Sequence, residues 1–138
     1  MREITLKASL DKLDEVISFV EQMLEELNCP MKFVVQMDVA VEEIFVNIAH
    51  YAYPDTEGDA RIEAGTSEDG LFYVSFSDSG VPYNPLKKPD PDVTLDAEDR
   101  PIGGLGIYMV KKSMDRLDYR YENGQNIFTI YKDISEKG

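Results

Sequence analysis

The sequence predicts a two-layer α/β (α+β) sandwich, in which one mixed, mostly antiparallel sheet carries helices on a single face. Apolar periodicity gives the element order β-α-α-β-β-loop-α-β-β. The strand-like segments come in neighbouring pairs joined by short turns, which favours antiparallel pairing. A length of 138 residues suits one domain with its own core. We therefore expect a single domain over residues 1–138.

The first half of the chain alternates between strand and helix patterns. Residues 2–8 alternate polar and apolar side chains, as a half-buried strand does. Apolar residues at spacings of three and four then predict a helix that ends at about residue 27. Asn28-Cys29-Pro30 breaks this helix, and a second one is expected from about Pro30 to Ala52.

The second half contains two strand pairs, a long loop and a third helix. Residues 81–102 hold five of the seven prolines and show no apolar periodicity, so they are expected to form a long loop. Asn123-Gly124 is a strong signal for a tight hairpin turn. The expected ranges are 60–67 and 71–78 for the first strand pair, 103–114 for the helix, and 117–122 and 126–133 for the final hairpin.

The charge and residue composition exclude several functional classes. Asp and Glu number 27 against 14 Lys and Arg, a net charge of −13, which argues against nucleic-acid and anionic-membrane binding. A single cysteine, Cys29, excludes an internal disulfide and a cysteine zinc cluster, and a single histidine, His50, removes most other transition-metal sites. No apolar run reaches about 18 residues and no signal peptide is evident, so we expect a cytoplasmic protein.

Polar side chains form a stripe along the second predicted helix. Their spacing of 4, 3, 4 and 3 places them on one helical face. Apolar residues on both sides predict a largely buried helix, in which an acid, an amide and an imidazole would need partners. A functional site, a self-satisfied polar network and a surface stripe all remain open, and Glu42 is expected to be solvated. The stripe is Gln36, Ala40, Glu43, Asn47 and His50, between the apolar sets Phe33, Met37, Val41, Ile44, Phe45, Ile48 and Val35, Val39, Val46.

Two glycine-containing segments offer ligand-binding chemistry. Asp78-Ser79-Gly80 ends a predicted strand, where α/β sheets tend to place ligand-binding groups, although these residues also form ordinary turns. Gly103-Gly104-Leu105-Gly106 precedes an apolar helix, whose N-terminus and close backbone amides suit a phosphate without any basic surface. The segment lacks the Walker and GxGxxG patterns, and a flexible hinge is the alternative interpretation.

Taken together, the three segments resemble the N, G1 and G2 boxes of the GHKL, or Bergerat-fold, ATPases. The N box is Glu43-Ile44-Phe45-Val46-Asn47. The G1 stretch Asp78-Ser79-Gly80-Val81-Pro82-Tyr83-Asn84-Pro85 is similar to the form found in anti-sigma-factor serine/threonine kinases. The stretch Arg100-Pro101-Ile102-Gly103-Gly104-Leu105-Gly106-Ile107 resembles their G2 box. The resemblance covers nearly the whole chain and implies a Bergerat fold.

This resemblance implies an ATP site that uses Mg²⁺. Asn47 would be the Mg²⁺ ligand, and Glu43 would be the base that accepts the proton of the nucleophile. Asp78 would accept a hydrogen bond from the adenine amino group, and residues 81–102 would form a lid over the nucleotide. The full ATP-contacting set that the resemblance implies is Asn47, His50, Asp78, Gly80, Arg100, Gly103, Gly104, Leu105 and Gly106.

Two positions depart from the family pattern. His50 stands where related histidine kinases often carry lysine, so it would either touch a phosphate or cap the helix end. Asn126 stands near the place where many members have a threonine beside adenine, which leaves the water-mediated adenine contact open. Arg100 adjoins the glycines and is placed to reach a phosphate.

The function implied by the resemblance is an ATP-dependent protein serine/threonine kinase that is also an anti-sigma factor. It would phosphorylate a STAS-type anti-anti-sigma protein and alternatively bind a sigma factor, and homodimerisation is common in that family. The main alternative is a nucleotide-gated module that binds a partner without phosphotransfer. A severed histidine-kinase domain is disfavoured because the lone histidine, His50, lies in the N-box helix. A pseudo-ATPase scaffold is the last alternative.

Overall fold

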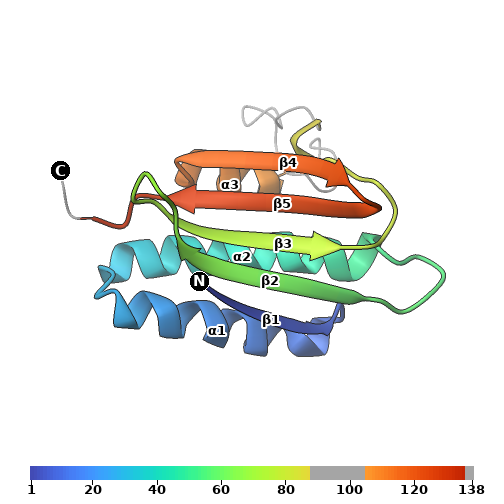
Figure 1. Cartoon of the computed structure of the whole chain (residues 1–138), viewed down its shortest axis with the longest axis horizontal. Coiled ribbons are helices and arrows are strands. Elements are labelled where there is room, and N and C mark those ends of the chain that lie inside the picture. The colour runs from blue at the N-terminus through green and yellow to red at the C-terminus, as the bar shows by residue number, and fades with distance from the viewer. Residues whose placement is uncertain (88–104, 136–138) are drawn as a thin grey trace.

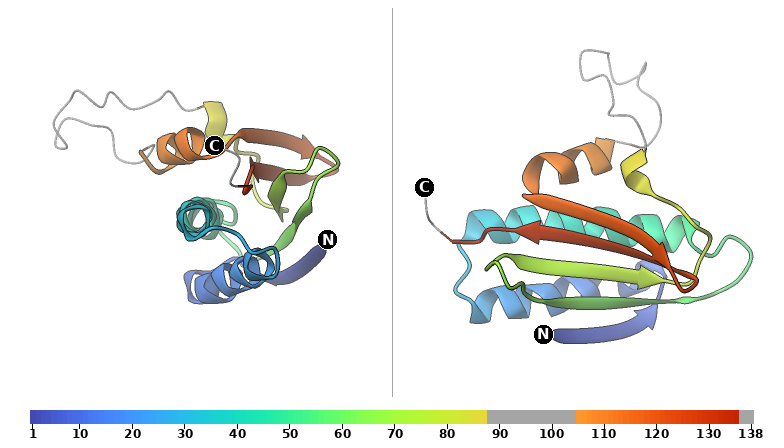
Figure 2. Two further views of the ribbon diagram at one scale, coloured as in Figure 1. Left: turned by 90° about the vertical axis from the view of Figure 1, so that its left-hand side faces the viewer. Right: turned by 45° about the horizontal axis from the view of Figure 1, so that its top comes forward.

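Five strands and three α-helices make two layers in the computed structural model, which describes residues 1–87 and 105–135 (Figure 1). The strands form one sheet in the order β1-β2-β3-β5-β4. Figure 2 shows the described helices together on one face of this sheet. The bounds are β1 Arg2–Lys7, α1 Leu13–Glu26, α2 Met31–Tyr51, β2 Asp59–Thr66, β3 Phe72–Asp78, α3 Leu105–Ser113, β4 Arg116–Glu122 and β5 Gln125–Lys132, with short 3₁₀ helices at Leu10–Lys12 and Pro85–Lys87.

The sandwich predicted from the sequence is confirmed, but the described sheet is antiparallel throughout and not mixed. All four strand pairings are antiparallel. The connections explain this. Two helices separate β1 from β2, so the chain returns to its neighbour in the opposite direction. β4 runs in the same direction as β3, but β5 lies between them.

The two short turns within the strand pairs, expected at Glu68-Asp69-Gly70 and Asn123-Gly124, adopt the backbone conformations that their residues favour. Gly70 has a φ of 84° in the β2–β3 turn, where the amide of Leu71 donates to the Ser67 hydroxyl over 3.1 Å. Asn123 and Gly124 have φ values of 54° and 77° in the β4–β5 turn, as a two-residue hairpin turn of the primed type requires. These turns fix the registers of the β2–β3 and β4–β5 pairs, and the separate pairing of β3 with β5 places Asp78 directly opposite Asn126.

The core lies between the sheet and the inner face of α2. Side chains from all three α-helices and from strands β2, β3 and β5 are almost completely removed from water there, and burial of this apolar area is the main stabilising term. The largest fully buried side chains are Phe45, Phe72, Phe76, Leu24, Met37, Ile62, Ile130, Val16, Val20, Val41, Val74 and Val110.

The prediction that α2 is buried on both apolar sides is wrong. Val35 and Val39 are 55% and 49% exposed, because the described chain places no layer outside the helices. Glu42 is exposed as expected. Within the described ranges no helix combines the length and hydrophobicity needed to cross a membrane.

Candidate functional site

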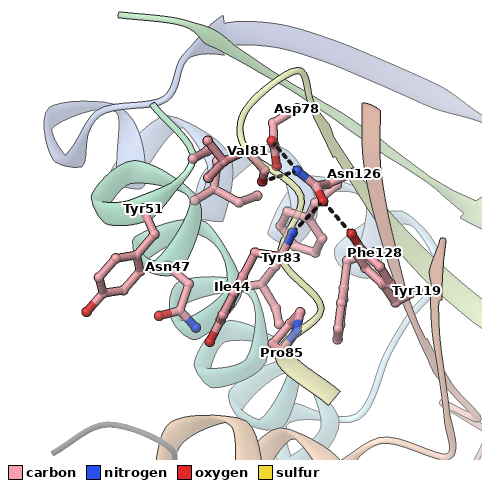
Figure 3. Close-up of a pocket in the computed structure, with 13 residues that line it drawn as sticks. Ile44, Asn47, Tyr51, Asp78, Val81, Tyr83, Pro85, Tyr119, Asn126 and Phe128 are labelled. Atoms are coloured by element: carbon pink, nitrogen blue, oxygen red, sulfur yellow. Dashed lines mark hydrogen bonds between the residues drawn. The ribbon is translucent and has the colours of Figure 1, made fainter. Parts of the chain in front are cut away.

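A largely apolar pocket opens between the C-terminal half of α2 and the end of β3 (Figure 3). It encloses about 460 Å³ of space, including its opening to solvent. Its walls come from α2, β3, β4, β5 and the segment after β3. The lining residues are Ile44, Asn47, Ile48, Tyr51, Ala52, Phe76, Asp78, Val81, Tyr83, Pro85, Tyr119, Asn126 and Phe128.

Asp78 is the one acidic side chain among the lining residues, and it is only 5% exposed. Its Oδ1 atom accepts hydrogen bonds from the backbone amide of Gly80 over 2.9 Å and from Nδ2 of Asn126 over 3.0 Å. No described residue donates a hydrogen bond to the second oxygen, Oδ2. A carboxylate oxygen that lines a largely apolar pocket and receives no hydrogen bond from the described residues can accept one from a ligand, so the pocket suits a ligand that carries an amino group.

Asn126 holds the segment after β3 against the sheet. Its amide nitrogen donates to Asp78 and to the carbonyl of Val81, over 3.0 and 2.9 Å. Its amide oxygen accepts hydrogen bonds from the backbone amide of Tyr83 over 3.0 Å and from the Tyr119 hydroxyl. Burial raises the pKa of Tyr119, which keeps that hydroxyl protonated and able to donate. With both of its N–H donors in use, Asn126 serves as an anchor for this wall of the pocket, a role that was not predicted from the sequence.

The glycine of the Asp78-Ser79-Gly80 segment is required by close packing against α2. A Cβ atom at Gly80 would lie 2.1 Å from the carbonyl oxygen of Ala52, and the next amide, of Val81, donates to that carbonyl over 2.9 Å. The Tyr53 hydroxyl accepts a hydrogen bond from the amide of Ser79 over 2.8 Å. Gly80 is not among the lining residues of the pocket, so its closeness to adenine stays a prediction.

Glu43 and Asn47 lie one helical turn apart on α2, beside the start of α3. Both are half-buried, and Nδ2 of Asn47 is 3.5 Å from Oε1 of Glu43. A Cβ atom at Gly106 would lie 1.9 Å from the carboxyl carbon of Glu43, so with any other residue at this position the carboxylate would have to move. Asn47 also lines the Asp78 pocket. The fold therefore brings together residues from all three of the segments singled out in the sequence.

A sequence profile described as a histidine kinase-like ATPase domain matches residues 6–132. The chain belongs to this family. The predicted family is thereby confirmed, and membership implies ATP binding. The relationship to the anti-sigma serine kinases is distant.

Curated serine-protein kinases named RsbW are among the relatives. A protein from Bacillus cereus is 30% identical over 95 residues, which cover 66% of this chain and 59% of that protein. The protein from Bacillus mycoides (strain KBAB4) is 33% identical over 95 residues, with the same coverage. The chain therefore spans about 59% of the length of the curated relatives that it matches.

Two solved structures share the fold. The RsbU and RsbW domains of Rv1364c from Mycobacterium tuberculosis superpose with a TM-score of 0.65 at 13% identity, covering 100% of this chain and 34% of that one. The histidine kinase domain of the Erythrobacter litoralis EL346 blue-light activated histidine kinase gives a TM-score of 0.56 at 17% identity, covering 78% and 48%. These similarities support the fold class alone.

The polar stripe of α2 does not form one continuous network in this family member. Ala40 is buried, while Gln36 keeps a buried Oε1 atom without a hydrogen-bond partner among the described residues. His50 is exposed in the last turn of α2, edge-on to the ring of Tyr51 at 5.9 Å, and it does not line the pocket. Its contact with a phosphate stays a prediction.

Several predicted site residues fall outside the described part of the chain. Arg100, Gly103 and Gly104 lie there, as do most of the predicted lid and the side chain of Leu105. The lining tyrosines Tyr51, Tyr83 and Tyr119 had no predicted role. They come from three separate elements, so no periodic pattern could have linked them.

The donor set suits a metal ion that takes most of its ligands from a nucleotide and water. Among residues 1–87 and 105–135, no group of three or more His, Cys, Asp or Glu side chains could hold a metal. Mg²⁺ commonly binds through one or two protein oxygens together with phosphates and water. The amide oxygen of Asn47 is a fitting single ligand at the pocket wall.

Proposed function

We propose that this chain is an ATP-dependent protein serine/threonine kinase that also acts as an anti-sigma factor. It phosphorylates a STAS-type anti-anti-sigma protein and sequesters a sigma factor. The observation that carries the proposal is the placement of the Glu43 carboxylate, one turn from the pocket-lining Asn47 and in contact with Gly106 at the start of α3. The serine-kinase names of the relatives support the same activity.

In this proposal, different residues of the pocket contact different parts of ATP. Apolar walls from α2 and β5 fit the faces of adenine, and the free Oδ2 of Asp78 accepts a hydrogen bond from its amino group. This contact selects adenine over guanine, which carries an oxygen at the matching position. Asn47 supplies one oxygen ligand to Mg²⁺, which offsets negative charge on the phosphate oxygens when it is bound.

Glu43 is the base in this proposal. Its carboxylate accepts the proton of the serine or threonine hydroxyl as that oxygen attacks the γ-phosphorus of ATP, while the bond from this phosphorus to the bridging oxygen breaks and ADP leaves. The tight fit of Gly106 against the carboxylate restricts its position, and positioning is a large part of catalysis in phosphoryl transfer. Backbone amides at the α3 N-terminus face developing negative charge without any basic side chain.

Phosphotransfer tests the proposal directly. Incubation with Mg-ATP and a cognate STAS protein should give phosphoserine or phosphothreonine on the partner. Glu43→Gln should lower the rate by at least about 100-fold while ATP affinity changes little, which is typical of losing a general base. Asp118→Asn, an exposed carboxylate on β4, is the matched control and should retain full activity. No transfer by the wild-type protein with intact ATP binding would remove the kinase claim.

A nucleotide-gated binding module is the second candidate. It is favoured by the long 3.5 Å contact between Nδ2 of Asn47 and Oε1 of Glu43. Partner binding that requires ATP but is unaffected by Glu43→Gln, with no phosphate transferred, identifies this function. In both cases the partner is a protein and not nucleic acid, and the expected compartment is the cytoplasm. Homodimerisation is part of the proposal and is tested by sedimentation.

A further inference from the structure

Helices α1 and α2 carry an excess of acidic residues, whereas α3 carries two lysines and no acid. Helices α1 and α2 contain five and three Asp or Glu residues, against a single lysine, Lys32. The five strands of the sheet together carry six acidic and six basic residues. The sheet is therefore close to neutral, while the pair of helices α1 and α2 is strongly negative. A partner that approaches α1 and α2 therefore encounters a negative electrostatic potential.

Exposed apolar side chains form a stripe along the outer face of α2, among the acidic residues of α1 and α2. Met31, Val35 and Val39 are 73%, 55% and 49% exposed. Their spacing of four residues stacks them on one face of the helix, and Glu42 continues the same face. The pocket is lined by α2 residues from Ile44 onward, so the stripe occupies the other half of the helix.

Two carboxylates beside the stripe, Asp38 and Glu42, lack cationic partners within the described residues. Asp38 keeps a buried Oδ1 atom that receives no hydrogen bond. Burial, a side-chain hydrogen bond with Glu21 on α1, and the charges of Glu21 and Glu42 raise the pKa of Asp38 to about 7. A buried acceptor without a donor is costly, so this position gains from a cation supplied from outside.

We propose that the outer face of α2, with the adjoining edge of α1, docks a basic amphipathic helix of a protein partner. The apolar side of that helix covers Met31, Val35 and Val39, and its Lys or Arg side chains pair with Asp38 and Glu42. Helix-in-groove recognition of this kind uses anchors at spacings of three and four. The inference does not rest on kinase activity, because none of these residues lines the pocket.

The charge pattern disfavours the other occupants. A second copy packed through the same face would set Asp38 and Glu42 against their own equivalents, and like charges brought together oppose binding. An anionic membrane would meet the same repulsion, because membrane-surface helices carry Lys and Arg on their polar face. A basic amphipathic helix can cover the apolar stripe with one side and pair its cationic side chains with the carboxylates.

A designed peptide provides the test. The probe is a synthetic helix of about 14 residues with leucines at spacings of three and four and lysines flanking them, as this binding mode requires. A peptide of the same composition in scrambled order keeps the charge and loses the apolar face. Fluorescence anisotropy should show binding of the amphipathic peptide at least about tenfold tighter than the scrambled one, a difference of about 1.4 kcal/mol.

Variants locate the binding surface. Val35→Ser with Val39→Ser should weaken binding of the amphipathic peptide at least about tenfold, and Asp38→Asn with Glu42→Gln should weaken it and reduce its salt dependence. Tyr121→Thr and Asp118→Asn, exposed positions on β4, are the matched controls and should leave binding unchanged. Circular dichroism confirms that each variant is folded.

Three results would overturn the proposal. Equal affinity for the scrambled peptide would mean that charge alone attracts it. Loss of self-association in the Val35→Ser, Val39→Ser variant would assign this face to a second copy of the chain. Binding of the wild-type protein to anionic vesicles, lost in the same variant, would assign the face to a membrane.

Discussion

Asp78→Asn is the substitution that probes the nucleotide pocket most selectively. The asparagine oxygen can accept the same two hydrogen bonds, from Gly80 and Asn126, that Oδ1 accepts now. The new amide nitrogen then occupies the position of the free Oδ2 and presents donors to the donor group of adenine. The substitution therefore keeps the internal bonds of the site and reverses its polarity toward the ligand.

The expected loss of ATP affinity in Asp78→Asn has two contributions. A hydrogen bond to a charged group contributes about 1.5–3 kcal/mol, and a buried donor left unsatisfied costs about 1–3 kcal/mol. A combined loss of about 3–4 kcal/mol raises the Kd for ATP by roughly two to three orders of magnitude. The preference for ATP over GTP should shrink or invert, because the guanine oxygen can accept from the new amide.

Isothermal titration calorimetry with ATP and GTP measures both effects, and thermal unfolding provides the control for the fold. The melting temperature without nucleotide should change by only a few degrees. Wild-type affinity for ATP in Asp78→Asn would refute the assignment of Asp78 to adenine. A large drop in melting temperature would instead show that Asp78 is chiefly a structural residue.

Three further substitutions test other features. Gly106→Ala should lower phosphotransfer by at least about 100-fold, because the added Cβ must displace Glu43, while ATP binding falls far less; equal activity would show that the carboxylate can move freely. Gly80→Ala should destabilise the fold by about 1–3 kcal/mol in urea unfolding, since its Cβ would overlap the carbonyl of Ala52; unchanged stability would contradict the close packing. Asp38→Asn should flatten the pH dependence of stability. The pKa of Asp38 is raised to about 7, so between about pH 4 and pH 7 the folded state holds the proton more tightly than the unfolded state. The wild-type protein should therefore lose stability as the pH rises through this range. If the melting temperatures of both proteins fell equally with rising pH, Asp38 would not be the cause.

Much of the fold could be predicted from local signals. Turn chemistry at Gly70 and at Asn123-Gly124 sets the two tight hairpins, and their backbone conformations agree with the expectation. The predicted bounds of helix α2 are correct to within a residue at each end, because Pro30 precedes it and its apolar period is strong. Such signals depend on neighbouring residues, so a sequence displays them directly.

The burial of α2 could not be predicted in the same way. An apolar face looks the same in a sequence whether it meets a core or solvent, so the pattern wrongly predicts that Val35 and Val39 are interior. The prediction that the sheet is mixed, with some parallel strand pairs, was wrong for a similar reason. Strand order depends on β5 lying between β3 and β4, which is a long-range choice.

The site was only partly visible in the sequence. The spacing of Glu43 and Asn47 predicted their shared face, and both contribute to the region beside the pocket. The anchoring role of Asn126 depends on its strand register opposite Asp78, and no motif encodes that register. The contact between Gly106 and Glu43 likewise joins residues far apart in the chain, through the packing of α3 on α2.

A crystal structure with Mg²⁺ and a non-hydrolysable ATP analogue tests the central claim most directly. We expect adenine in the pocket with its amino group hydrogen-bonded to the carboxylate of Asp78, and the metal bound by the amide oxygen of Asn47. The terminal phosphate should lie beside the carboxylate of Glu43, at the N-terminal end of α3. Adenine bound elsewhere, or a metal held without Asn47, would contradict the account.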